Sequence, residues 1–346
     1  MRRLIETNDG ALHRERGAVA VVTALLLTVL LAVGALAVDG GMLYAKRAQL
    51  QSGADAAAIA VAQKCAKSLT DPQCSATSTL ATSLAQSNMQ ANQAGIASLT
   101  INTTAQTVTA TTQPLQPGMQ PGSVSLFLAQ TLGITSATLG AAASAAWGSP
   151  STGLAAFPLT FSVCQVQGQI NGGAQLLQDH GVGANASCNY GPSGQFVPGG
   201  FGWLVQNPGQ CGATINVAQS EAGSSPGNSG PSNCEAVYQQ WITALQNGQQ
   251  AIVLLPIFTA VNGTGSSAVY TLAGFAAYSV IGWKFSGGTT APYVYNNQPS
   301  NVSSSLWCTG SCRGIIGQFI TYVTLDNTYQ VGPSTPFGAT IVRLTQ

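Results

Sequence analysis

The feature that most constrains this chain is an uncharged, apolar run near its N-terminus. Residues 17–38 read GAVAVVTALLLTVLLAVGALAV, in which Thr23 and Thr28 are the polar side chains. A helix of this length rises about 33 Å at 1.5 Å per residue, which matches a hydrocarbon core of about 30 Å. We therefore predict a transmembrane helix over residues 17–38.

Basic residues flank this run unevenly. Lys46 and Arg47 follow it, whereas four arginines precede it: Arg2, Arg3, Arg14 and Arg16. By the positive-inside rule, residues 1–16 form a cytoplasmic tail and the body after the run is extracytoplasmic. The alternative is a signal peptide cleaved after Ala37. The run is longer than the usual signal-peptide core of about 7–15 residues, which favours a retained cell-membrane anchor. Either way, the body is exported.

Charge is scarce in the rest of the chain. Charged residues make up 6% of the sequence, the net charge is +1, and no charge occurs between Pro72 and Gln178. Ordinary proteins have about 25% charged residues. Nothing here indicates nucleic acid as a partner. Because aromatic and apolar runs recur too often for a disordered chain, we expect a folded body with an uncharged polar surface.

All the cysteines follow the apolar run, and their even number predicts disulfides in an oxidising compartment. The eight are Cys65, Cys74, Cys164, Cys188, Cys211, Cys234, Cys308 and Cys312. Nearest-neighbour pairing joins 65–74, 164–188, 211–234 and 308–312, although eight cysteines allow 105 connectivities. Zinc at Cys308 and Cys312 is a weaker alternative, because no second cysteine pair or nearby histidine completes the site. We expect no metal and no cofactor.

Periodicity predicts an α+β fold: a long N-terminal membrane-anchored helix with a small pilin-like sheet, followed by a β-rich disulfide-bonded domain. The first part, residues 39–149, continues the anchor helix. The elements expected up to there are helices over Arg14–Ala66, Ser75–Ala94 and Val124–Leu132, and strands over Leu99–Thr112 and Thr138–Trp147.

Residues 150–346 form the exported β-rich domain in this prediction. An amphipathic helix is expected over Cys234–Gln246, where Val237, Trp241 and Leu245 share a face. The expected strands are Leu159–Val166, Thr214–Val217, Ala251–Val261, Ala268–Trp283, Phe319–Leu325 and Thr340–Leu344. Gly/Ser/Asn-rich stretches over 220–233 and 287–305 are expected to be loops.

A specific pattern surrounds the apolar run. Arg16-Gly17 precedes it, and its end reads Ala37-Val38-Asp39-Gly40-Gly41-x-Leu43-Tyr44-x-x-Arg47-x-x-Leu50-Gln51-x-x-Ala54-Asp55-Ala56-Ala57-Ala58. Over about residues 14–66 the chain resembles the TadE/TadG-like N-terminal segment of Flp (tight-adherence) pilus-assembly proteins. The resemblance implies a membrane-anchored, non-enzymatic component of a Flp pilus or a related secretion apparatus. Its partners would be membrane lipid and other pilus-assembly membrane proteins. Some TadG-like proteins carry a von Willebrand A domain, but its Asp-x-Ser-x-Ser metal motif does not occur here.

The candidate assembly residues are Asp39, Gly40, Arg47, Leu50, Gln51, Ala54, Asp55 and Ala57. Ala54, Ala57 and Ala58 give a small-residue face that would permit close helix–helix approach. A leucine at Ala57 is then expected to weaken recovery of partner proteins. A simpler interpretation stays open, in which Asp39, Lys46 and Arg47 only mark the membrane boundary and Arg47 and Asp55 are solvated charges.

Two other functions are weighed. A membrane-anchored adhesin could bind a surface glycan through aromatic rings, namely Trp203, Trp241, Trp283, Trp307, Tyr270, Tyr293 and Tyr295, although core packing explains most aromatics in β-rich domains. An exported hydrolase would need His180, beside Asp179, with Cys164 or Cys188 as nucleophile, or a Glu221–Glu235 carboxylate pair. Disulfides and helix capping explain these residues better, so no catalytic residue is predicted.

Overall fold

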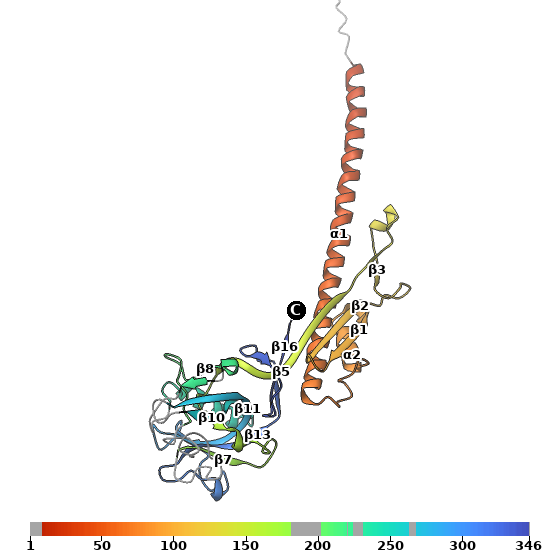
Figure 1. Ribbon diagram of the computed structural model, residues 1–346. Helices are drawn as coiled ribbons and strands as arrows, with labels where there is room; N and C mark the ends of the chain where they lie inside the picture. Colours follow the sequence, from red (N-terminus) through yellow and green to blue (C-terminus); the bar gives the residue numbers. More distant parts are fainter. Residues whose placement is uncertain (1–8, 181–201, 220, 224–230, 263–267, 346) are drawn as a thin grey trace, which may run out of the picture. The chain divides into compact units, whose positions relative to one another are not determined.

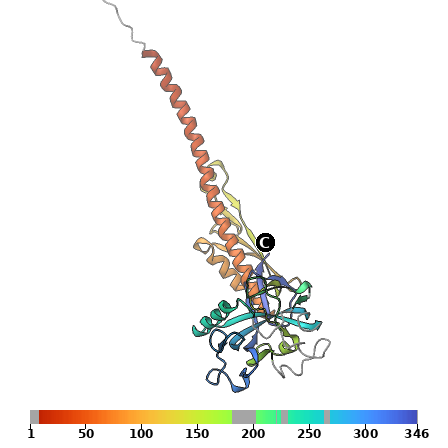
Figure 2. The same ribbon diagram turned by 90° about the vertical axis from the view of Figure 1, so that its left-hand side faces the viewer.

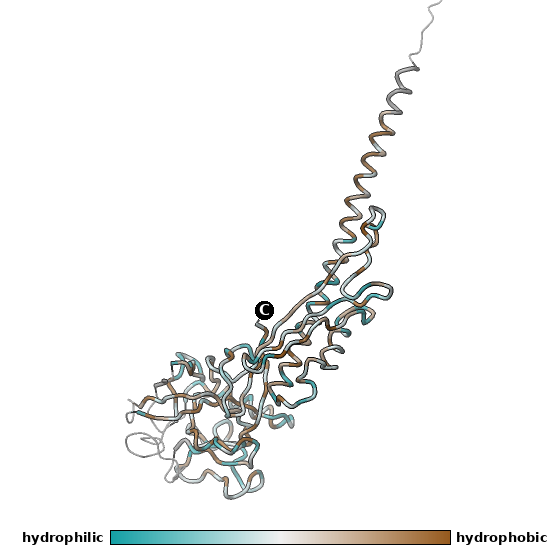
Figure 3. Tube along the Cα trace, turned by 45° about the vertical axis from the view of Figure 1, so that its right-hand side comes forward, coloured by the Kyte–Doolittle hydropathy of each residue, from teal (hydrophilic) through white to brown (hydrophobic). Residues whose placement is uncertain are grey.

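One continuous helix, α1 (Asp9–Lys67), carries the apolar run and continues well beyond it. Its 59 residues correspond to a rod of about 88 Å. From Ala18 onward it is long and apolar enough to cross a membrane, and the large side chains described between Val19 and Val38 are all exposed. Figure 3 shows this apolar half of α1 in brown. The helix predicted over Arg14–Ala66 is confirmed.

The computed structural model describes residues 9–180, 202–219, 221–223, 231–262 and 268–345. Within these, the chain divides into two compact units. The first unit contains the described residues up to Ala58, Ala76–Thr100 and Thr109–Ser144, and the second contains Ile59–Ser75, Ile101–Val108 and the described residues from Ala145 onward. The α+β class and the disulfide-bonded, β-rich body are as predicted. The domain boundaries predicted above stay a prediction.

The first unit packs a small sheet and a short helix against α1 (Figure 1). Its strands are β1 (Ala94–Asn102), β2 (Thr107–Pro114) and the start of β5 (Ala141–Ala155), in the order β1-β2-β5. Helix α2 (Thr79–Ser87) begins at Ser78, whose hydroxyl accepts the N–H of Ala81. Along β2, buried residues alternate with half-buried ones, so one face of the strand meets the core. Leu50, Met89, Ala94 and Ala141 form that core.

Two predictions about this unit are wrong. The helix expected over Val124–Leu132 is instead a hairpin, in which β3 (Ser123–Ser125) pairs with β4 (Ser136–Thr138). Its loop, residues 126–135, contains one 3₁₀ turn, η2 (Ala129–Leu132). The single strand expected over Leu99–Thr112 is the β1–β2 pair, because Asn102 turns the chain by accepting the N–H groups of Thr104 and Ala105.

The second predicted helix, Ser75–Ala94, is shorter than expected. It ends near Asn88, whose backbone N–H bonds back to the carbonyls of Gln86 and Leu84. A short 3₁₀ turn, η1 (Gln90–Asn92), follows, in which Ala91 and Asn92 have positive φ angles. These left-handed residues stop an α-helix from continuing.

The second unit is built on a sheet with the order β6-β10-β11-β13-β7. These strands are β6 (Phe161–Ser162), β10 (Ala251–Asn262), β11 (Val269–Lys284), β13 (Arg313–Ile320) and β7 (Gln175–His180), with β9 (Glu221–Gly223) and β12 (Val294–Tyr295) also paired to β11. Strands β10 and β11 form the long central hairpin, antiparallel from Ala251↔Val280 to Asn262↔Val269. Figure 2 shows it within the β-rich body.

A second group of strands in this unit pairs around the later part of β5. The order is β5-β16-β14, and β8 and β15 also pair with β5. The strands are β8 (Ala213–Asn216), β14 (Tyr322–Thr324), β15 (Gln330–Gly332) and β16 (Ala339–Leu344). The strands predicted over 214–217, 251–261, 268–283 and 340–344 are confirmed. The one predicted over 159–166 is wrong after Ser162, because Ser162 and Gln165 form a capping box that starts α3 (Val163–Val166).

Aromatic rings fill the core of the second unit beneath α4 (Glu235–Gln246), the helix predicted there. The ring of Phe157 lies 5.1 Å from that of Trp241, at an edge-on angle. Tyr238 stacks on Phe285 at 5.3 Å. Such pairs add to the stability that burial of the rings already gives.

Disulfide bonds cross-link the second unit. Among the described residues, bonds join Cys65 to Cys74, Cys211 to Cys234 and Cys308 to Cys312, which are three of the nearest-neighbour pairs. Cys164 is also disulfide-bonded, but Cys188 lies outside the described residues, so that pairing stays a prediction.

Removing the Cys211–Cys234 bond with two alanines is expected to destabilise the second unit more than removing Cys308–Cys312. The bonds have sequence separations of 23 and 4 residues. By lowering the entropy of the unfolded chain, the longer loop stabilises the fold by about 3 kcal/mol and the shorter by about 2 kcal/mol. Thermal unfolding of both double variants under oxidising conditions measures this. A larger loss of Tm for the Cys308–Cys312 variant would contradict it.

Candidate functional site

Asp39, the first residue after the apolar run, holds a distant loop against α1. Its carboxylate accepts the backbone N–H groups of Phe127 (2.9 Å), Leu128 (3.0 Å) and Ala129 (2.6 Å). All these residues belong to the first unit. The carboxylate thus satisfies N–H groups where the turn η2 begins, which have no partner within a helical turn. We call this arrangement the Asp39 clamp.

The clamp decides the charge state of Asp39. The residue is 5% exposed. Burial alone would raise the pKa of its carboxyl, but the hydrogen bonds from Ala129, Phe127 and Leu128 outweigh burial and hold the pKa below its ordinary value of 3.8. Hydrogen bonds to an ionised acceptor are the stronger kind. Asp39 is therefore an anion at neutral pH, and that anion organises the loop.

Further residues of the TadE/TadG-like pattern also hold the chain's own fold. The carbonyl of Leu50 accepts the buried hydroxyl of Thr112 at 2.8 Å. The amide of Gln51 donates to Asp55 at 2.8 Å and to the carbonyl of Ala142 at 3.1 Å. Through Thr112 and Ala142, these bonds tie α1 to β2 and β5.

The small residues of the pattern are internal. Ala54, Ala57 and Ala58 have no exposed surface. Gly53, beside them, lies so close to α2 that a Cβ at this position would be 3.2 Å from the Cα of Ala85. The close approach that these residues permit is thus made within the chain, and Ala57 offers no surface to a partner.

A different face of α1 stays exposed in the residues that follow the apolar run. Gly40, Gly41, Ala45, Arg47, Ala48 and Ser52 are exposed, and the ring of Tyr44 is 79% exposed. Gly41, Ala45, Ala48 and Ser52 recur at steps of four and three, which places them on one side of the helix. Of the candidate assembly residues, the structure therefore buries Asp39, Leu50, Ala54 and Ala57, half-buries Gln51 and Asp55, and leaves Gly40 and Arg47 on the surface.

Sequence reasoning missed the partners of these residues. The N–H groups that bind Asp39 are 88–90 positions away in the chain, and a backbone donor has no signature in a sequence. Thr112 was visible only as one of several threonines in a strand. The signal that could have been used is the apolar triplet Leu126-Phe127-Leu128 within an uncharged stretch.

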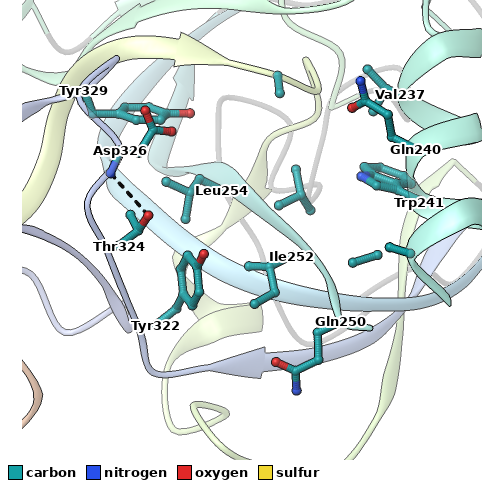
Figure 4. Close-up of a pocket in the computed structure, with 14 residues that line it drawn as sticks. Val237, Gln240, Trp241, Gln250, Ile252, Leu254, Tyr322, Thr324, Asp326 and Tyr329 are labelled. Carbon is teal, nitrogen blue, oxygen red and sulfur yellow. Dashed lines mark hydrogen bonds between the residues drawn. The ribbon is translucent and has the colours of Figure 1, made fainter. Parts of the chain in front are cut away.

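The second unit has a groove of about 330 Å³ between α4, β10 and β14 (Figure 4). Ile252, Leu254 and the half-buried Tyr322 give it apolar walls, and Gln240 and Asp326 add polar groups. The Asp326 carboxylate is already engaged by Thr328, whose N–H and hydroxyl both bond to it.

Most of the aromatics predicted to stack on a glycan lie in the core. Trp203, Trp241, Trp283 and Tyr270 are buried, so their faces pack on protein. Trp307, Tyr293 and Tyr295 are half-buried, and Tyr295 stacks on Trp283 at 5.2 Å. Glycan binding stays a prediction.

The residues considered for catalysis are engaged elsewhere or not described. The Tyr293 hydroxyl donates to Glu235 at 2.7 Å, and this bond holds the pKa of Glu235 below its ordinary value. His180 is the last residue of β7 and Glu221 the first of β9. The structure describes the backbone of these two residues but not their side chains. Within the described parts of the chain, no group of three or more His, Cys, Asp or Glu residues could hold a metal ion.

Comparison with known proteins identifies the N-terminal segment. Residues 17–64 match the family described as Flp pilus-assembly TadE/G-like, which confirms the resemblance seen in the sequence. No curated protein and no solved structure matches the chain. The match supports a role related to Flp pilus assembly, and this family suggests a structural role.

Asp39→Asn is expected to release the 126–135 loop. The substitution removes the charge and sets an amide N–H₂ against backbone N–H groups. Hydrogen exchange at Phe127, Leu128 and Ala129 is then expected to accelerate about tenfold or more, because hydrogen bonds to charged acceptors contribute more to stability than those between neutral groups. Mass spectrometry of the full chain in lipid nanodiscs measures it. Asp55→Asn is the matched control, since its carboxylate bonds Gln51 and not the loop; equal acceleration in both variants would contradict the clamp.

The clamp is also expected to respond to pH. Because the folded-state pKa of Asp39 is lowered, its stabilising effect is complete above the unfolded pKa of about 3.9 and is lost as pH falls through the lower folded value. Protection factors of the same amides are therefore expected to stay constant from pH 7 to 5 and to fall below about pH 4. Unchanged protection at pH 2 would show that the carboxylate charge is not needed.

Proposed function

We propose that this chain, whose residues 17–64 are TadE/G-like, is a membrane-anchored structural component of a Flp-type pilus or a related surface secretion apparatus. The observation that carries the proposal is the continuity of α1. The large apolar side chains described between Val19 and Val38 are exposed, whereas Leu50, Ala54 and Val61 farther along the helix are buried in folded protein. Such a helix suits a subunit that is held in a bilayer and presents its body outside it.

In this proposal the N-terminus is cytoplasmic and the body is extracytoplasmic. The arginine excess before the run supports that orientation. The disulfides support export to an oxidising compartment. Residues 1–16 are then the cytoplasmic tail, 17–38 the transmembrane helix, 39–149 the pilin-like region and 150–346 the exported β-rich domain.

The partner surface in this proposal is the exposed side of α1 just outside the membrane. It comprises Gly41, Tyr44, Ala45, Ala48 and Ser52. Small side chains let a second helix approach closely, and a largely exposed tyrosine is a typical contact residue of protein interfaces. Other pilus-assembly membrane proteins, with helices leaving the same bilayer, are the partners that this surface fits.

Ala48→Leu and Ala57→Leu make a matched test of this surface. The same substitution on the same helix is exposed at Ala48 and fully buried at Ala57. Ala48→Leu is expected to leave Tm within about 1 °C, because exposed substitutions change stability little, and to reduce co-purification of pilus-assembly membrane proteins. Ala57→Leu is expected to lower the stability of the fold by about 1–3 kcal/mol through overpacking.

Co-purification from detergent-solubilised membranes, with Tm measured on the same preparations, separates the outcomes. Partner loss with Ala48→Leu at unchanged Tm supports the proposal. Full partner recovery with Ala48→Leu, in a variant that folds normally, contradicts the proposed surface. Recovery of the parent chain without any pilus-assembly protein contradicts the assembly function itself.

A further inference from the structure

Two large apolar side chains are exposed together on the loop between β3 and β4. Phe127 is 67% exposed and Ile134 is 56% exposed. The remaining loop residues carry no charge, and the sequence from Leu126 to Thr135 reads LFLAQTLGIT. An exposed pair of this kind costs free energy in water, so its surroundings in the native membrane matter.

The Asp39 clamp fixes where this loop lies along α1. Phe127, Leu128 and Ala129 bond to the residue that directly follows the apolar run. Figure 1 and Figure 2 agree that the β3–β4 hairpin runs beside α1 toward its apolar half. If residues 17–38 fill the hydrocarbon core, the loop is held at the level where hydrocarbon gives way to headgroups.

Several polar groups of the loop are satisfied within the chain. The N–H of Leu126 bonds the carbonyl of Thr135, and the N–H of Ile134 bonds that of Ala129. The side chains of Gln130 and Thr131 donate to the carbonyls of Phe127 and Leu128. The clamp satisfies the N–H groups that remain at the start of the turn. Backbone that enters a region poor in water must meet this condition.

The dimensions fit the interfacial layer. Headgroups add about 5–8 Å on each side of the hydrocarbon core, and α1 rises about 7.5 Å from Asp39 to Tyr44. Tyr44, 79% exposed, therefore falls at the outer limit of the layer. Lys46 and Arg47 come just beyond it, from where their long side chains can reach back to the phosphate groups. Aromatic residues concentrate at this depth in membrane proteins.

We propose that the loop Leu126–Thr135 is a second membrane contact, with Phe127 and Ile134 inserted into the headgroup layer of the bilayer that α1 crosses. The partner is the lipid surface itself. This proposal rests on the membrane anchor of the proposed function and adds to it: the first unit is held to the membrane at two points, so it does not swing freely about α1.

Tryptophan scanning of the full chain in phosphatidylcholine nanodiscs tests the proposal. The fluorescence of Phe127→Trp and Ile134→Trp is compared with that of the parent chain. The emission of the parent's five tryptophans is subtracted, which leaves the emission of the added one. Leu115→Trp is the matched control, because Leu115 is also exposed in the first unit but lies farther along α1 from the apolar run. Its backbone N–H bonds the carbonyl of Gln93, next to η1. The backbone N–H of Gln90 in η1 in turn bonds the side chain of Gln49, ten positions beyond Asp39 on α1.

The expected result is a blue-shifted added emission from Phe127→Trp and Ile134→Trp that lipids brominated at acyl carbons 6 and 7 quench more than lipids brominated at carbons 11 and 12. The Leu115→Trp emission is expected to stay red-shifted and unquenched. Adding Asp39→Asn to Phe127→Trp is expected to weaken the quenching, because the clamp is gone.

Unquenched, red-shifted emission from Phe127→Trp in discs that hold the chain overturns the proposal and leaves the anchor standing. Emission that shifts to the blue only when other pilus-assembly membrane proteins are reconstituted with the chain also overturns it, in favour of a protein contact. A chain that does not enter the discs at all overturns the anchor, and this inference with it.

Discussion

The structure depends on one helix whose two segments need different surroundings, lipid for the apolar run and folded protein for the rest. The large side chains described between Val19 and Val38 of α1 are apolar and exposed, which water does not favour and lipid does. Over the other half, Leu50, Ala54 and Val61 are buried in protein. The change occurs at Asp39, where a carboxylate that would be costly near hydrocarbon is satisfied by backbone N–H groups.

Several residues of the TadE/G-like segment therefore hold the chain's own fold. Asp39 binds the β3–β4 loop, Gln51 binds Asp55 and the backbone of β5, and Gly53 lets α2 pack closely. These contacts build a small sheet on the part of α1 that follows the apolar run. In the proposed function, partners contact the opposite side of the helix, near Tyr44. In the proposed function, such a subunit presents its β-rich body while its anchor and partner surface stay at the membrane.

The sequence was informative wherever a signal was local. The apolar run predicted α1, strands were predicted over 251–261 and 268–283 where β10 and β11 lie, and nearest-neighbour cysteine pairing matched the disulfides now described. It failed where a local choice depended on a distant group. Residues 124–132 have an apolar composition that suits a helix, but Asp39 takes the N–H groups near its middle and the chain forms a hairpin instead. The small-residue face around Ala57 was recognised, but not that it is buried within the chain's own fold, since hydropathy does not identify the partner of a buried face.

The most direct test of this account is the intact mass of the native protein recovered from isolated membranes after alkaline washing. The account predicts that the chain stays in the membrane pellet and that its mass includes residues 17–38. A soluble protein whose sequence begins at Val38 would contradict it, because α1 would then have lost the segment that holds the chain, its clamp and its partner surface at the bilayer.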